Sequence, residues 1–93
     1  MNLYLLAEEP VQNHQQQDCC LIVEISAPDG VDNQLVRLTT EETIREKFGT
    51  GLRLWSADED EVFQYLEADP GASTGTLSLS NDVSVTWHLA RIV

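Results

Sequence analysis

The side chains of this chain that could do chemistry are mostly carboxylates. Its 93 residues hold 16 Asp and Glu against 5 Lys and Arg, which gives a formal net charge of -11. The acids gather in two blocks that contain no Lys or Arg, residues 8–32 and residues 58–69. A surface of this charge repels nucleic acid and anionic lipid and attracts cationic partners. We expect a partner-binding acidic face in the second block, built from Asp58, Glu59, Asp60, Glu61, Glu67 and Asp69.

The second block also has a simpler interpretation. Acids in the first turn of a helix complement the helix dipole, and each stabilises the helix by about 0.3–1 kcal/mol. Glu67 and Asp69 extend the block further, and no Lys or Arg follows at i+4 to offset their repulsion. Asp58, Glu61 and Gln64 recur at about one helical turn, a row that could imitate phosphates. A solvated helix face and a partner-binding face therefore both stay open, and the block at residues 8–32 is the alternative contact face.

The sequence lacks the motifs of a catalytic or metal site. His14 and His88 are accompanied by no serine elbow or His-based triad motif. His14, Cys19 and Cys20 match no zinc spacing, and adjacent strand residues point to opposite faces of a sheet. We therefore predict a protein that is not an enzyme, with no metal, no cofactor and reduced thiols. No apolar run approaches the roughly 18 residues of a membrane span, so a cytoplasmic location is expected.

The elements that position these side chains follow from periodicity and turn signals. Residues 3–7 are apolar and residues 19–25 nearly so, and both segments are predicted to be strands, the second one central. Residues 8–17 are predicted to form a polar loop and residues 28–30 a turn. Thr39 with Glu42, and Ser56 with Glu59, have the capping-box spacing that begins a helix. These pairs predict helices over about residues 40–48, ending at Gly49, and about 57–68, with a strand at 52–55 between them.

Side-chain patterns complete the expected fold. The inward residues of the helices should be Ile44, Phe48, Val62, Phe63 and Leu66, and Trp55 and Trp87 should be core residues of strands. The last part of the chain reads as a hairpin in which Leu77 faces Val85 and Leu79 faces Val83 across the loop Ser80-Asn81-Asp82. The order β-β-α-β-α-β-β predicts a single α+β domain, a two-layer sandwich with both helices on one face of a largely antiparallel sheet.

Residues 1–55 also show a family resemblance. The opening Met1-Asn2-Leu3-Tyr4-Leu5-Leu6, a polar loop, a strand, a helix closing with Lys47-Phe48-Gly49 and the strand Leu52-Arg53-Leu54-Trp55 together resemble the layout of some small anti-CRISPR proteins of phages and mobile elements. The resemblance implies a non-enzymatic inhibitor that binds a bacterial CRISPR effector complex, often through acidic residues placed on a basic nucleic-acid channel. The second acidic helix departs from that layout.

Two functions follow as hypotheses. The first is an inhibitor that occupies a basic, nucleic-acid-binding surface, by nucleic-acid mimicry. The second is an acidic adaptor, assembly or immunity-type protein that binds its partner through a sheet edge or aromatic residues. Salt distinguishes them, because charge-led binding weakens with ionic strength whereas an apolar interface hardly responds.

Overall fold

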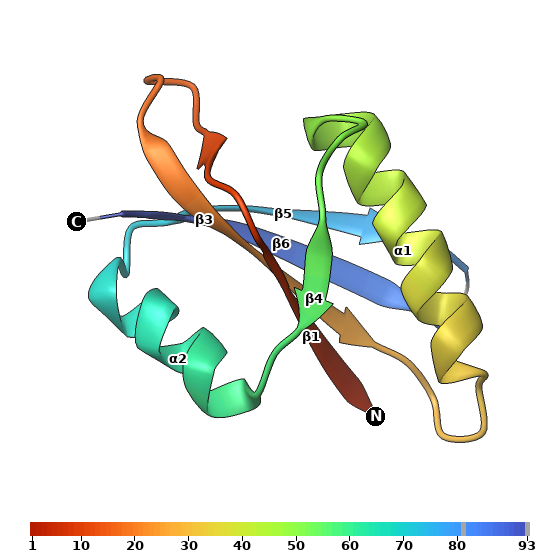
Figure 1. Cartoon of the computed structure of the whole chain (residues 1–93). Helices are drawn as coiled ribbons and strands as arrows, with labels where there is room; N and C mark the ends of the chain where they lie inside the picture. The colour runs from red at the N-terminus through yellow and green to blue at the C-terminus, as the bar shows by residue number, and fades with distance from the viewer. Residues whose placement is uncertain (81, 93) are drawn as a thin grey trace.

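The central element of the fold is the long strand β3 (Asp18–Ser26), which pairs antiparallel with β1 (Asn2–Ala7) on one side and β6 (Ser84–Arg91) on the other (Figure 1). The computed structural model describes residues 1–80 and 82–92. In this part of the chain the sheet runs β4-β1-β3-β6-β5, and the short β2 also pairs with β3. The remaining elements are β2 (Val11–Gln12), α1 (Asn33–Phe48), β4 (Leu54–Ser56), α2 (Glu59–Ala68) and β5 (Ser73–Ser78). The α+β class, the antiparallel sheet and the two predicted strands at residues 3–7 and 19–25 are confirmed.

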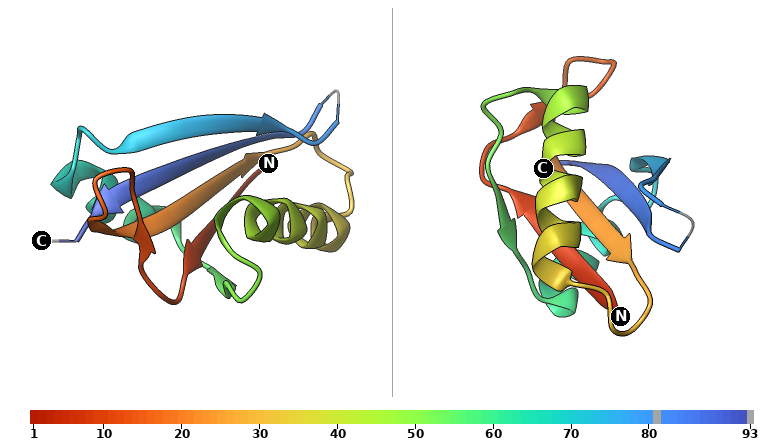
Figure 2. Two further views of the ribbon diagram at one scale, coloured as in Figure 1. Left: turned by 90° about the horizontal axis from the view of Figure 1, so that it is seen from above. Right: turned by 90° about the vertical axis from the view of Figure 1, so that its right-hand side faces the viewer.

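The two helices lie on opposite faces of the sheet. One core combines Val36 and Ile44 of α1 with Leu5 of β1 and Leu21 of β3. The other combines Val62 of α2 with the neighbouring strand residues, Leu6 and Ile22. Figure 1 views the sheet nearly edge-on, with α1 on one side and α2 on the other, and Figure 2 shows the same separation from two further directions.

The prediction of two layers with both helices on one face is therefore wrong, and the architecture has three layers. The physical reason lies in consecutive apolar residues. Leu5 and Leu6, like Leu21 and Ile22, point to opposite sides of the sheet, and all four are buried. A strand that is apolar at every position requires cover on both faces.

Helix α1 begins seven residues earlier than the predicted start at about residue 40. Its N-cap is Asp32, whose Oδ1 accepts hydrogen bonds from the backbone N–H of Gln34 (3.0 Å) and Leu35 (3.2 Å). Thr39 lies inside the helix, where its hydroxyl donates to the Leu35 carbonyl oxygen at 2.9 Å. The Thr39 capping box is therefore wrong, because a side chain already bonded to the preceding turn does not begin a helix. The end at Gly49, which has a positive φ of 145°, is as expected.

Helix α2 follows β4 directly, and its first turn starts after Asp58. Ser56 belongs to β4, and its hydroxyl oxygen accepts a hydrogen bond from Arg37 Nη1 at 2.6 Å. Asp58 has the extended backbone of an N-cap but its side chain makes no capping bond. The Ser56 capping box is therefore wrong, and the acids of the first turn act on the helix through its dipole.

The C-terminal hairpin has the predicted register. Leu77 of β5 pairs with Val85 of β6, and the Leu79 N–H donates to the Val83 carbonyl oxygen at 3.2 Å. The predicted loop Ser80-Asn81-Asp82 includes Asn81, which lies outside the described residues. Within the described ranges, no helix is both long and apolar enough to cross a membrane.

Candidate functional site

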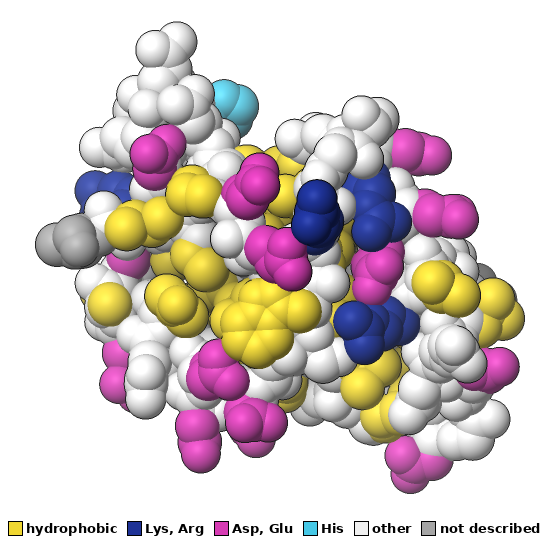
Figure 3. Space-filling model, in the orientation of Figure 1, with side chains coloured by type: hydrophobic (Ala, Val, Ile, Leu, Met, Phe, Trp, Pro, Cys, Tyr) yellow, Lys and Arg dark blue, Asp and Glu magenta, His cyan; other side chains and the backbone are white. Residues whose placement is uncertain are grey.

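The first turn of α2 brings the predicted acidic residues together. Glu59, Asp60 and Glu61 form that turn directly after Asp58, the N-cap. Asp58, Glu59 and Asp60 are exposed, Glu61 is half-buried, and Glu67 is exposed near the end of the helix. In Figure 3 acidic side chains lie along the lower edge of the molecule, over the start of α2. Four of the six predicted acids therefore lie together at the start of α2, and Glu67 lies near its end.

Asp69 does not belong to this exposed group. Its side chain is 4% exposed and is held by Arg91, at the end of β6. Arg91 donates its backbone N–H (2.9 Å) and Nε–H (3.0 Å) to Oδ2, and its Nη2–H to Oδ1 (2.7 Å). These bonds lower the pKa of the Asp69 carboxyl from 3.8 to about 2. Asp69 thus anchors the end of α2 to the sheet, and the expectation that it belongs to a contact face is corrected.

Cations do not neutralise the acids of α2. Among the described residues, no ion pair involves Asp58, Glu59, Asp60, Glu61 or Glu67. On α1, the nearly buried Glu41 binds Arg37 (2.9 Å) and Arg45 (3.4 Å). Arg45 also donates to the Leu52 carbonyl oxygen at 2.9 Å, so this network ties α1 to the segment before β4. Arg37 and Arg45 are therefore engaged within the fold and do not pair with the acids of α2.

The tyrosine next to the acidic turn responds to that charge. Tyr4 of β1 packs against the core beneath α2, and burial raises the pKa of its phenol. The charges of Glu59 and then Glu24 raise this pKa further. Tyr4 is therefore uncharged at neutral pH.

Aromatic side chains flank the acids, and the sequence interpretation placed two of them wrongly. Phe63 and Tyr65 of α2 are each 44% exposed, and Trp55 of β4 is 39% exposed. Trp55 pairs with Leu6, so it lies on the face of the sheet that carries α2. The expectations that Phe63 points inward and that Trp55 is a core residue are wrong, because a ten-residue helix buries a narrow stripe and a three-residue edge strand gives little cover. Large aromatic side chains at the rim of a charged surface are typical anchors of protein interfaces.

The N-terminal acidic block is dispersed over the molecule. Glu8 lies 4.0 Å from Arg53, Glu24 lies 3.5 Å from His88, and Asp32 caps α1. Asp18 begins the central strand, and Asp29 lies in the turn before α1. These acids do not share one helix face, so α2 is the better candidate for a contact surface.

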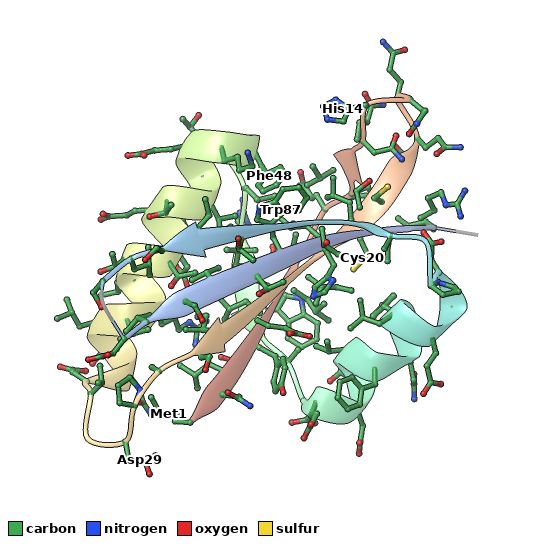
Figure 4. The ribbon with its side chains drawn as sticks, turned by 180° about the vertical axis from the view of Figure 1, so that it is seen from behind. Met1, His14, Cys20, Asp29, Phe48 and Trp87 are labelled. Atoms are coloured by element: carbon green, nitrogen blue, oxygen red, sulfur yellow. The ribbon has the colours of Figure 1, made fainter. Side chains whose placement is uncertain are left out.

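His14, Cys19 and Cys20 do not converge. His14 is in an exposed loop, whereas Cys19 packs in the core beneath α1 and Cys20 against the core beneath α2 (Figure 4). Burial raises the pKa of both thiols, which keeps them protonated at neutral pH. Over residues 1–80 and 82–92, no three His, Cys, Asp or Glu side chains are grouped so that they could hold a metal ion.

Comparison of the chain with protein families, with curated proteins and with solved structures finds no match.

Proposed function

We propose that this chain is a non-enzymatic inhibitor that binds a basic, nucleic-acid-binding surface of another protein, with the exposed acids of α2 as its contact face. The observation that carries the proposal is that, among the described residues, no Lys, Arg or His forms an ion pair with Asp58, Glu59, Asp60 or Glu67. Unpaired carboxylates repel one another. No existing salt bridge has to be broken before they bind a partner. They are therefore available to arginine and lysine side chains that otherwise hold phosphates.

The mechanism is competition for the same basic groups. A net charge of -11 steers the chain towards a cationic channel and raises the association rate. At contact, carboxylates accept charge-assisted hydrogen bonds from guanidinium groups with a geometry close to that of phosphate. Phe63 and Tyr65, exposed on the same helix, supply the apolar contact area that turns a steered encounter into a lasting complex.

The resemblance of residues 1–55 to small anti-CRISPR proteins gives the first partner to test, a CRISPR effector complex in the bacterial cytoplasm. In that setting the chain excludes target DNA from the effector. The test is binding of target DNA by the effector complex, measured with increasing amounts of the chain.

The decisive variant is Asp58→Lys, Asp60→Lys and Glu67→Lys, which reverses three exposed acids that have no ion-pair partner in the described part of the chain. We expect it to lose inhibition by about a hundredfold or more, because each contact to a charged group contributes about 1.5–3 kcal/mol. The matched control, Glu8→Lys, Glu9→Lys and Asp18→Lys, changes the net charge equally in the dispersed block and should keep most of the inhibition. Thermal melts verify that both variants fold. Full inhibition by the folded α2 variant would contradict the acidic-face proposal.

The exposed aromatics favour one alternative, an adaptor that binds mainly through Trp55, Phe63 and Tyr65. In that case Phe63→Ala and Tyr65→Ala would abolish binding while the charge reversals would leave it nearly unchanged. Binding would then also be almost independent of salt.

A further inference from the structure

The last strand of the sheet, β5, has a free edge. β5 is the terminal strand of the order β4-β1-β3-β6-β5, and among residues 1–80 and 82–92 it pairs with β6 alone. Backbone groups of successive residues in an antiparallel strand point alternately to the two sides. The Leu79 N–H donates to the Val83 carbonyl oxygen, just before β6. The backbone N–H and C=O groups of the odd-numbered residues of β5 therefore point towards β6. The N–H and C=O groups of Thr74, Thr76 and Ser78 therefore point outward, away from the sheet.

This edge lacks the features by which proteins usually prevent strand addition. Such features are charged side chains, proline, bulges and very short strands. β5 is six residues long and reads Ser-Thr-Gly-Thr-Leu-Ser, without charge or proline. The opposite edge differs, because β4 has three residues, and a very short edge strand offers few backbone groups to a further strand. Of the two edges, β5 is the one open to a further strand.

We propose that β5 pairs with β5 of a second copy of this chain, antiparallel and about a two-fold axis at Thr76. This register sets Thr76 opposite Thr76 and Thr74 opposite Ser78, so that the outward groups of each strand meet those of the other. It also sets Leu77 of one copy opposite Gly75 of the other.

The contact at Gly75 adds apolar burial to the backbone bonds. The Trp87 indole lies across Gly75 and leaves no room for a Cβ atom there, while Phe48 packs edge-to-face on Trp87 with a centroid distance of 5.2 Å (Figure 4). Leu77 is half-buried on the same face of the sheet. In the proposed register Leu77 of the second copy covers the indole edge above Gly75, and on the other face threonines and serines meet one another.

The distribution of charge also favours the β5 edge as the contact between two copies. Two chains of net charge -11 repel each other, and the repulsion is least where both surfaces are neutral. Residues 70–81 contain no Asp, Glu, Lys, Arg or His, and β5 lies within this stretch. One strand pair with small side chains buries less area than the roughly 1,200 Å² of a stable interface, so the dimer is a weak one that forms at high concentration. Added salt strengthens it by screening the repulsion, whereas salt weakens the charge-led binding proposed above.

The test is the mass of the full chain by sedimentation equilibrium, from micromolar to near-millimolar concentration, at low and at high NaCl. We expect the mass to rise from the 10.4 kDa monomer towards twice that value with concentration, and to rise further at high salt. Thr76→Pro removes an outward N–H and no bond to β6, and should weaken the dimer by about tenfold or more. Thr76→Ala keeps the N–H and should still dimerise.

A second pair of variants covers the case in which Thr76→Pro fails to fold. Thr76→Lys places a charge at the two-fold axis and should also give a monomer. Ser84→Lys adds the same charge at an exposed position of β6, whose backbone is already paired on both sides, and should leave the dimer intact. A wild-type chain that stays at 10.4 kDa throughout, or a dimer that persists in the folded Thr76→Pro or Thr76→Lys variant, would overturn the proposal.

Discussion

At the scale of single residues, Asp69 shows how a long-range contact changes the role of an acid. In the sequence it is the last member of an acidic run, and nothing near it signals a partner. Arg91 is 22 positions further on and reaches Asp69 only because β6 ends beside the end of α2. The exposed acids Asp58 to Asp60 were predictable from local sequence, since a helix start on the surface exposes them. The buried one was not.

The Asp69–Arg91 contact predicts a specific dependence of stability on pH. The pKa of Asp69 is lowered in the folded state, so its stabilisation is fully present above pH 3.8 and is lost as the pH falls towards about 2. Asp69→Asn should therefore lower the free energy of unfolding at pH 7, and the difference from wild type should shrink as the pH falls through this window. Denaturant unfolding at a series of pH values measures it.

The matched control is Glu67→Gln, which removes the same charge from an exposed side chain in no described ion pair and should have little effect. A difference between Asp69→Asn and wild type that is equal at pH 7 and pH 2 would show that lost packing, and not the charge, is responsible.

At the scale of elements, most strands were predictable, whereas the short β2 inside the predicted loop at residues 8–17 and the helix starts were not. Alternation and apolar runs identify β1, β3 and the β5–β6 hairpin, because side-chain direction in a strand is a local property. The spacing Thr39-x-x-Glu42 is that of a capping box at a helix start, but the same spacing also occurs inside helices. The choice depends on Asp32, which follows the turn after β3 and begins α1 early enough to bury Val36. The side of the sheet on which each helix packs depends on the path of the connections, which local pattern does not contain.

The position of the α1 start predicts opposite outcomes for two alanine variants. Asp32→Ala should destabilise the protein by about 1 kcal/mol, because the N–H groups of Gln34 and Leu35 lose their acceptor. Thr39→Ala should be neutral or slightly stabilising, since alanine is the better helix former in an exposed interior position. Chemical denaturation of both variants decides this, and a larger loss for Thr39→Ala would contradict the structural assignment.

At the scale of the whole molecule, charge is distributed unevenly and this distribution organises the proposed contacts. The arginines on α1 and at the end of β6 are engaged by Glu41 and Asp69. The acids of α2 stay unpaired among the described residues, and β5 forms an uncharged edge. Under the two proposals, a cationic partner binds at α2, and a second copy binds at β5, where the repulsion between two acidic chains is least. We therefore predict that high salt weakens the first contact and strengthens the second.

The most direct test of the central proposal is the association rate constant with a CRISPR effector complex, measured over a series of NaCl concentrations for the wild type and the Asp58→Lys, Asp60→Lys and Glu67→Lys variant. We predict that the wild-type rate falls steeply as NaCl increases, and that the variant associates more slowly with a much shallower salt dependence. Equal salt dependence in the two proteins, or a wild-type rate that salt does not change, would contradict binding through the acidic face of α2.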